Sequence, residues 1–279
     1  MSISWKNKTA VITGASSGVG ASFAKFLAQE GLHVVLTARR EERLKDLQAG
    51  IIDRGGKADY FAADISIENE REALFKKINA AVGDVDILIN NAGFGWYGYY
   101  SDMPWELAKQ MAAVNMMGVL HLTNQFLPGM LVRGKGHIIN IGSIAGGLPN
   151  QGIAVYSASK AFIDAFTTSL YRELRGSNVQ ASVMRLGPVK TEFYDQGREL
   201  KNGRSIPAEK FAISTEKVDS ALWRLINHPQ RVVYVPRWLA VSRFVEIIFG
   251  GVIDRIGPVL LKKRDKHKKQ ESQIDRINR

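Results

Sequence analysis

The chain has 279 residues, of which 45% are hydrophobic and 23% charged, and its formal net charge is +11. This composition is ordinary for a globular protein and allows one large α/β domain or two small ones. The chain contains no Cys, which excludes disulfides, a thiolate nucleophile and a cysteine-based metal site. The five His residues are scattered without ligand spacing, so we expect no metal site.

The first residues of the chain lack the apolar segment of a secretory signal. Together with the absence of Cys, this favours a cytoplasmic location.

A strand, a glycine-rich turn and a helix follow one another near the start. Residues 9–13 predict a buried strand, and residues 21–30 predict a helix that ends at Gly31. Between them lies the turn Gly14-Ala15-Ser16-Ser17-Gly18-Val19-Gly20. Glycines allow close approach of the backbone to a ligand, and a helix N-terminus favours a pyrophosphate. We therefore expect a dinucleotide to contact Gly14, Ser16, Ser17, Gly18, Val19 and Gly20.

Two cations follow the second predicted strand, residues 33–37. Folds that bind dinucleotides often have an acidic residue here, on the ribose hydroxyls, but this chain has Ala38 and then Arg39 and Arg40. A guanidinium binds a 2′-phosphate through charge-assisted hydrogen bonds, whereas an acid repels it. The sequence thus favours NADP(H) over NAD(H). In the alternative interpretation, the two Arg side chains only cap a loop beside Glu41 and Glu42.

Helices and strands continue to alternate as far as residue 90. Helices are predicted at 41–54 and 68–82, and strands at 58–63 and 85–90. Such alternation predicts a parallel sheet with helices on both faces. Asp64 and Ile65 follow the third strand at the carboxyl edge, where ligands bind. We expect this pair to contact an adenine, unless Asp64 only caps the following helix.

Further motifs then complete a recognisable pattern. The motifs are Thr13-Gly14-x-x-x-Gly18-x-Gly20, Asn90-Asn91-Ala92-Gly93, Asn115, Ser143 and Tyr156-x-x-x-Lys160. In this order and at these intervals, the chain resembles the short-chain dehydrogenase/reductase family over roughly residues 5–236. The resemblance implies an α/β, Rossmann-type doubly wound parallel sheet of about seven strands, flanked by helices in a single domain. It also implies that Asn91, Ala92 and Gly93 contact the cofactor.

Tyr156 and Lys160 lie one turn apart on one face of a helix predicted at about 155–175. A neighbouring ammonium favours the phenolate, so we expect Lys160 to lower the pKa of Tyr156. Taken alone, such a pair is usually an exposed aromatic side chain beside a solvated Lys. The family resemblance makes it catalytic: Tyr156 donates or accepts the proton, and Lys160 also holds the nicotinamide ribose. In the same resemblance, Ser143 binds the substrate oxygen and Asn115 holds a water that links Lys160 to solvent.

The loop Leu186-Gly187-Pro188-Val189-Lys190-Thr191 follows a strand predicted at 179–185. Members of the family usually have Pro-Gly at its start, and here Leu186 replaces the proline. The resemblance implies that the Val189 backbone and Thr191 face the nicotinamide carboxamide, while the replacement leaves the shape of the loop open.

Five aromatic residues lie within Phe94-Gly95-Trp96-Tyr97-Gly98-Tyr99-Tyr100, directly after the fourth strand. They predict an apolar pocket wall, a packed surface loop or an oligomer contact. Phe94, Trp96, Leu148 and Phe193 are the expected substrate contacts beside Ser143. The polar segment 193–213 is expected to be a loop that lines the substrate pocket and acts as a mobile lid.

A helix at 215–227 and a strand at 231–235 complete the predicted domain, residues 1–236, and a C-terminal extension, 237–279, follows. Apolar residues recur at helical spacing from 238 to 256, and residues 262–279 contain eight Lys or Arg against three Asp or Glu. Charges interrupt the apolar run, so no membrane span is predicted. We expect the helix to pack on its own domain or on a partner in a homodimer or homotetramer. Peripheral membrane contact through 238–269 is the next alternative. A nucleic-acid partner is not expected, because the tail lacks interleaved aromatic residues.

The predicted function is hydride transfer between NADP(H) and a carbonyl or secondary alcohol, with a hydrophobic ketone or aldehyde as substrate. The alternative is a scaffolding or membrane-peripheral protein of the same fold, in which cofactor binding or the tail matters more than turnover. A non-catalytic protein is expected to lose one of Ser143, Tyr156 and Lys160, and all three are present.

Overall fold

The fold is built on one sheet of seven parallel strands. The computed structural model describes residues 5–203, 209, 211–242 and 244–255. The strand order is β3-β2-β1-β4-β5-β6-β7, so the chain crosses from one half of the sheet to the other between β3 and β4. Ligands bind such sheets beyond the carboxyl ends of the strands on either side of this switch point. The strands are β1 (Thr9–Thr13), β2 (His33–Ala38), β3 (Lys57–Ala62), β4 (Ile87–Asn90), β5 (Gly136–Ser143), β6 (Val179–Leu186) and β7 (Val232–Val235).

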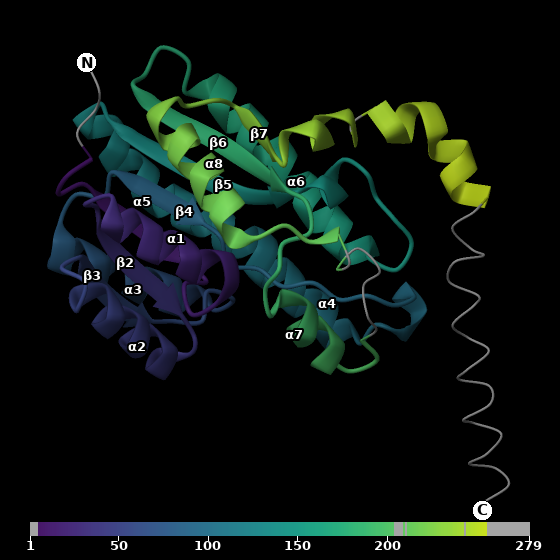
Figure 1. The fold of residues 1–279 in the computed structure, drawn as a ribbon, viewed down its shortest axis with the longest axis horizontal. Coiled ribbons are helices and arrows are strands. Elements are labelled where there is room, and N and C mark those ends of the chain that lie inside the picture. The colour runs from purple at the N-terminus through teal and green to yellow at the C-terminus, as the bar shows by residue number, and fades with distance from the viewer. Residues whose placement is uncertain (1–4, 204–208, 210, 243, 256–279) are drawn as a thin grey trace, which may run out of the picture.

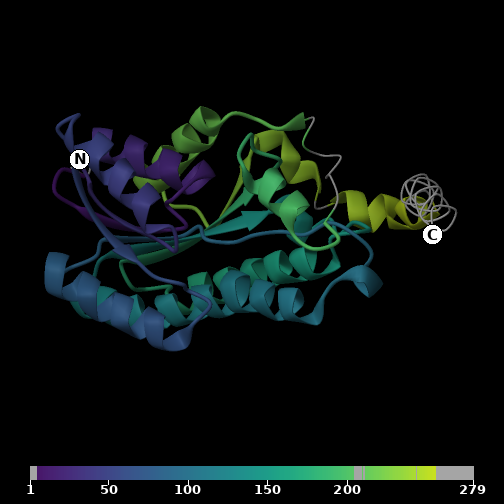
Figure 2. The ribbon, with the colours of Figure 1, turned by 90° about the horizontal axis from the view of Figure 1, so that it is seen from below.

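Helices cover both faces of the sheet (Figures 1 and 2). One face carries α1 (Gly18–Gln29), α2 (Glu41–Ile52) and α8 (Thr215–Asn227). The opposite face carries α3 (Glu68–Val82), α5 (Val119–Arg133) and α6 (Ala154–Glu173). Further helices are α4 (Trp105–Ala112) and α7 (Phe193–Glu199), and short 3₁₀ helices are η1 (Tyr100–Asp102), η3 (Ile144–Gly146) and η5 (Arg237–Val241). A π-helical turn, η2 (Ala113–Gly118), joins α4 to α5.

The core lies in two layers because successive side chains of a strand point to opposite faces. In β1, Ala10 and Ile12 pack under α1, α2 and α8, whereas Val11 packs under the helices of the other face. Since both faces are covered, β1 and β4 are buried along their whole length. Such strands have nearly continuous apolar sequences, as the patterns at residues 9–13 and 87–90 do.

The predicted seven-stranded parallel sheet in a single domain is confirmed. Helices α3 and α8 begin and end at the predicted residues, whereas α1 begins three residues earlier, at Gly18. The prediction of a loop throughout 193–213 is wrong for its first part, which forms α7. Residues 204–208 and 210 of that segment lie outside the described residues.

The C-terminal extension begins by packing on the domain. Leu239 of η5 is buried, and a Cβ at Gly187 would lie 2.5 Å from its Cδ1 atom. Residues 244–255 are helical and project from the body (Figure 1), with Ile247 80% and Ile248 66% exposed. The alternative in which this helix packs on its own domain is therefore wrong for these side chains. The boundary at residue 236 stays a prediction.

Among the described residues, no helix is both long and apolar enough to cross a membrane. The basic segment 262–279 lies outside the described residues.

Candidate active site

A cavity of about 710 Å³ opens at the carboxyl edge of the sheet. It brings together residues from the glycine-rich turn and from the ends of β2 to β6, which are far apart in the sequence. Of the predicted site residues, Gly20 and Asn115 do not line it, and the others do: Gly14, Ser16, Ser17, Gly18, Val19, Arg39, Arg40, Asp64, Ile65, Asn91, Ala92, Gly93, Phe94, Trp96, Ser143, Leu148, Tyr156, Lys160, Val189, Thr191 and Phe193.

The glycine-rich turn forms a cradle at the start of α1. Gly18 has a φ of +54°, a left-handed conformation that favours glycine. Gly20 shapes the turn from behind, because a Cβ there would lie 2.4 Å from the carbonyl oxygen of Gly14. The side chain of Asn91 donates to the Thr13 carbonyl at 2.9 Å and fixes the end of β4 beside the turn. The resulting cradle at a helix N-terminus fits a pyrophosphate.

The side chain of Arg40 lies against the same turn. Its Nε and Nη2 atoms donate to the Ser16 hydroxyl at 3.1 and 3.0 Å, and Nη2 donates to the Ser17 hydroxyl at 2.6 Å. Arg39 is less fixed, with 62% of its side chain exposed and Nη1 3.9 Å from Asp64. Arg40 forms its ion pair with Glu192 and not with Glu41 or Glu42, so the loop-capping alternative does not describe it.

Asp64 does not cap α3, whose N-terminal cap is Ile67. Its carboxylate instead accepts a hydrogen bond from the backbone of Ser66 at 2.9 Å. Asp64 and Ile65 both line the cavity next to Arg39, at the end where an adenine was expected.

Lys160 is buried at the other end of the cavity. Its Nζ donates to the Ile141 carbonyl at 2.8 Å and lies 5.8 Å from the centre of the Tyr156 ring. Burial lowers the pKa of Lys160 to about 8, although the Asp164 carboxylate one turn further along α6 favours the ammonium. Asp164 in turn forms an ion pair with Arg185 at 3.0 Å.

The environment of Tyr156 keeps its phenol protonated. Burial raises the pKa of Tyr156, and the hydrogen bond with Ser143 opposes this only in part. Because the loss of solvation prevails, the pKa of Tyr156 is raised overall, and the lowering effect expected of Lys160 stays a prediction. A protonated phenol beside a hydroxyl group is arranged to give a proton to an oxygen atom in the cavity.

Asn115 lies behind the cavity wall, in the π-helical turn η2. Its side-chain amide donates to the Phe94 carbonyl at 3.0 Å and to the Ser159 hydroxyl at 3.1 Å, and its oxygen accepts from the Phe94 backbone. A Cβ at Gly93 would lie 3.0 Å from Asn115 Oδ1 and 3.7 Å from Lys160 Nζ, so both groups border the same glycine. Single π-helical turns often occur at functional sites, and here the turn connects the end of β4 with α6.

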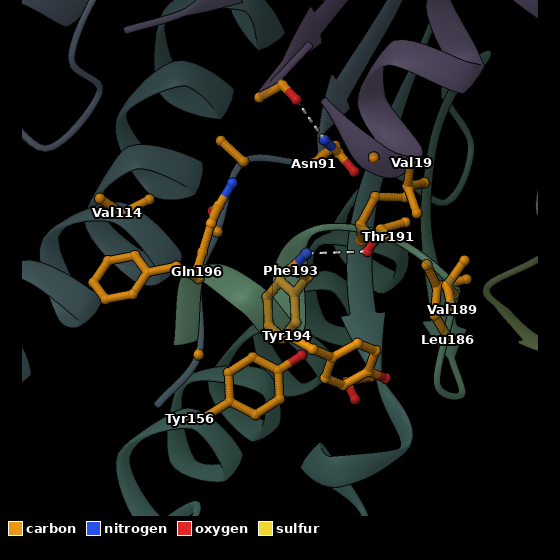
Figure 3. Close-up of a pocket in the computed structure, with 18 of the residues that line it drawn as sticks. Val19, Asn91, Val114, Tyr156, Leu186, Val189, Thr191, Phe193, Tyr194 and Gln196 are labelled. Carbon is orange, nitrogen blue, oxygen red and sulfur yellow. Dashed lines mark hydrogen bonds between the residues drawn. The ribbon is translucent and has the colours of Figure 1, made fainter. Parts of the chain in front are cut away.

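Apolar and aromatic side chains form the wall nearest Tyr156 (Figure 3). The ring centre of Phe193 lies 5.8 Å from that of Tyr156, and Tyr194 packs edge-on against Phe193 at 5.7 Å. Trp96 borders the cavity but is only 3% exposed, and its indole donates to the Lys201 carbonyl at 3.1 Å. Trp96 is therefore packed inside its loop and also forms part of the cavity wall.

Three lining residues, Gln110, Asn150 and Ile153, were not predicted from the sequence. Tyr194, Gln196, Glu199 and Leu200 also line the cavity, and they belong to the segment 193–213 that was expected to line it. The adjacent aromatic residues Phe193 and Tyr194 were the available signal for this wall.

Among the described residues, one group of side chains has the composition of a metal site, although the sequence predicts none. The side chains of Glu68, Glu72 and His121, from α3 and α5, lie within 4.8 Å of one another. The sequence did not show this because the fold packs the two helices together. Arg71 donates to one ring nitrogen of His121 and Gln125 contacts the other, at 2.9 Å each, so the ring is already engaged.

Comparisons with known proteins agree with this architecture. A family model described as short chain dehydrogenase matches residues 8–202. A fatty acyl-CoA reductase of Acinetobacter baylyi is 33% identical over 261 residues, which are 90% of this chain and 84% of the relative.

Two solved structures have a similar fold and bind different cofactors. A short-chain dehydrogenase from Sphingobium yanoikuyae in complex with NADPH has a TM-score of 0.76 and 28% identity, over 84% of this chain and 90% of that one. A short chain dehydrogenase/reductase from Burkholderia phymatum in complex with NAD has a TM-score of 0.79 and 27% identity, over 86% and 93%.

Proposed function

Since this chain belongs to the short-chain dehydrogenase/reductase family and is an oxidoreductase, we propose that it transfers hydride between NADP(H) and a hydrophobic ketone or aldehyde, or the corresponding alcohol. The observation that carries the proposal is the joining of the Arg40 cluster and the Ser143–Tyr156–Lys160 group by one cavity. In this proposal, the cofactor phosphate binds at the Arg40 end of the cavity and proton transfer takes place at the Tyr156 end.

The proposed preference for NADP(H) rests on charge at the end of β2. The solved neighbours bind NADPH in one case and NAD in the other, so similarity does not decide between them. This chain has no acid directly after β2, and Arg40 is already fixed on the Ser16 and Ser17 hydroxyls. A guanidinium with two neighbouring hydroxyls matches the acceptor oxygens of a 2′-phosphate.

The rest of the cofactor would follow the edge of the sheet. In this proposal Asp64 and Ile65 contact the adenine, Gly18 and Val19 the pyrophosphate, and Thr191 the nicotinamide carboxamide. The remaining expected contacts are Gly14, Ser16, Ser17, Arg39, Asn91, Ala92, Gly93 and Val189, while Gly20 shapes the turn from behind. When bound, the cofactor supplies or accepts the hydride.

In the direction of reduction, Tyr156 gives its proton to the substrate oxygen. Ser143 donates a hydrogen bond to the same oxygen and stabilises the negative charge that develops there. Lys160 holds the nicotinamide ribose and keeps a positive charge near Tyr156 while its ammonium is protonated. Asn115 positions the end of β4 against α6 and links Lys160 to a water. Tyr156 performs the reverse proton transfer in oxidation.

The proposed substrate class follows from the wall around Tyr156. Phe94, Leu148 and Phe193 present apolar surface to the cavity, and Trp96 closes it from behind. Such a wall selects a substrate with hydrophobic groups next to the carbonyl. The name of the Acinetobacter baylyi relative, a fatty acyl-CoA reductase, fits an apolar carbonyl substrate of this kind.

A panel of ketones and aldehydes, assayed for NADPH oxidation, tests the proposal. We expect turnover of hydrophobic members, and we expect Tyr156→Phe to abolish it. Tyr171→Phe on the same helix is the matched control and should stay active, because Tyr171 does not line the cavity. Undiminished turnover in Tyr156→Phe would refute the assigned chemistry.

The exposed helix favours a second candidate function, peripheral attachment to an anionic membrane. Ile247, Ile248, Phe249 and Val252 are each at least half exposed on residues 244–255. The tail 262–279, which follows in the sequence, carries eight cations and three acids. An apolar helical face next to excess positive charge suits an anionic lipid surface, whereas two such tails in a dimer would repel each other.

Co-sedimentation with phosphatidylserine vesicles tests this attachment. The truncation is best placed after Ser242, because Leu239 packs on the domain and must be kept. We expect the full chain to bind and the truncated chain to remain in solution. The contrary outcome is that the full chain does not bind vesicles but forms dimers, and that Ile247→Ser separates these dimers. That result would make this helix an interface between copies of the chain.

A further inference from the structure

Within the part of the chain that the structure describes, Glu192 is the one acidic side chain that pairs with Arg40. Arg40 Nη2 donates to Glu192 Oε1 at 2.9 Å, and Arg43 donates to both carboxylate oxygens at 2.8 and 3.0 Å. Glu192 lies between Thr191 and α7, 152 residues from Arg40 in the sequence. Its position therefore depends on how the segment 191–199 folds over the glycine-rich turn.

This carboxylate remains ionised at any physiological pH. The hydrogen bond with Ser17, followed by those from Arg43 and Arg40, lowers the pKa of Glu192 to about 2, although partial burial opposes this. Ser17 and Arg40 are also the groups proposed to bind the 2′-phosphate. An anionic side chain thus already engages the donors that an anionic ligand would need.

We propose that the Glu192 carboxylate occupies the place of the cofactor phosphate on Arg40. NADP(H) displaces this carboxylate from Arg40, and NADH does not. The proposal rests on the phosphate site proposed above. A carboxylate and a phosphate cannot both approach one guanidinium closely without repelling each other. Arg43 is half exposed and binds both oxygens of Glu192, so it can keep the carboxylate after Arg40 has turned to the phosphate.

The exchange would reach the substrate pocket through the next residue. Phe193 begins α7 and packs on the Tyr156 ring, and its backbone N–H points to the Thr191 hydroxyl at 3.4 Å. When Arg40 releases Glu192, α7 loses one of the contacts that hold its N-terminal end. This is the end that covers Tyr156. The phosphate would therefore act on the wall of the substrate pocket as well as on affinity.

Calorimetric titration of Glu192→Gln with NADPH and with NADH, without substrate, tests the exchange. Because the competing charge is removed, we expect NADPH to bind roughly tenfold more tightly and NADH to change by less than about twofold. Asp195→Asn is the matched control, since it removes the same charge from an exposed residue of α7 that pairs with Arg198 and does not line the cavity. It should leave the ratio of the two affinities unchanged.

Hydrogen exchange of the segment 192–199 supplies a readout independent of affinity. We expect NADPH to change its exchange more than NADH does in the wild type, and Glu192→Gln to remove that difference. Weaker NADPH binding in Glu192→Gln, or an equal effect on both cofactors, would overturn the exchange. Arg40→Ala separates the two proposals: if it weakened NADPH and NADH equally, the phosphate site itself would be refuted, whatever Glu192→Gln does.

Discussion

The two ends of the cavity use opposite physical means. At the phosphate end, Arg40, Arg43 and Glu192 are partly exposed and interact through charge, which water and salt weaken. At the catalytic end, burial governs Tyr156 and Lys160, raising the pKa of the phenol and lowering that of the amine. The first end should therefore respond to charge substitution and ionic strength, and the second to pH and to the loss of a single hydroxyl.

The largest effect is expected at the catalytic end. Removing the hydroxyl in Tyr156→Phe should lower the turnover number by about 10²–10⁴-fold, the usual contribution of a positioned proton donor. Affinity for NADPH, measured by titration, should stay within about threefold, because the phosphate end is untouched. A parallel loss of affinity and turnover would mean that Tyr156 is needed for cofactor binding and not for proton transfer.

At the phosphate end, the expected effect is on affinity. Arg40→Ala should weaken NADPH binding by roughly 10–100-fold and NADH binding far less, since one charged hydrogen-bond partner of the phosphate is lost. Turnover at saturating NADPH should stay close to that of the wild type. Arg39→Ala should show a smaller effect in the same titration, because most of the Arg39 side chain is exposed. If Arg39→Ala weakened NADPH binding more than Arg40→Ala does, the phosphate would be assigned to Arg39.

The direction of the Tyr156 pKa shift predicts different pH profiles for the two reaction directions. Because burial raises the pKa, the phenol remains protonated at neutral pH, and reduction should be nearly constant there. Oxidation needs the phenolate and should accelerate as pH rises toward that pKa. Initial rates at saturating substrate in both directions test this prediction. An oxidation rate that does not rise with pH would contradict it.

A smaller pH effect is expected from Lys160. Its pKa of about 8 means that the side chain is charged below pH 8 and loses its charge above it. An anionic cofactor favours the charged form and raises that pKa on binding, so affinity should be constant below pH 8 and fall by a few fold above it. Titration of wild type and Lys160→Met across this range measures the effect. A decline of the same size in Lys160→Met would show that another group causes it.

The smallest expected effect is that of ionic strength on cofactor affinity. Added salt screens the exposed Arg40 cluster, so NADPH affinity should decline more steeply with salt than NADH affinity. Binding isotherms at low and moderate salt are sufficient. Parallel slopes for the two cofactors would argue against a phosphate held by exposed cations.

Local sequence patterns predicted the first strands of a parallel sheet, because β1 and β4 are buried on both faces and have continuous apolar sequences. The expectation of about seven strands came from the family resemblance. The glycine-rich turn and the Tyr156–Lys160 pair are each contained in a few consecutive residues. Both could therefore be recognised in the sequence. Helix α5 contains Pro128, and no helix was predicted at 119–133. The bonds of Glu192 to Arg40 and Arg43 span about 150 residues of sequence and depend on folded geometry, so no local pattern indicates them.

The pKa of Tyr156 also required the structure. Helical spacing placed Lys160 beside the phenol, but spacing does not show how much water the fold excludes from both groups. Burial determined the direction of both shifts.

The most direct test of the central claim follows the hydride itself. The protein is incubated with NADPH carrying deuterium on the reactive carbon of the nicotinamide, together with a hydrophobic aldehyde or ketone that it consumes. We predict an alcohol product with deuterium on the former carbonyl carbon, formed about 10²–10⁴-fold more slowly by Tyr156→Phe. A product without deuterium, or no NADPH consumption with any carbonyl of the panel, would contradict the proposed function.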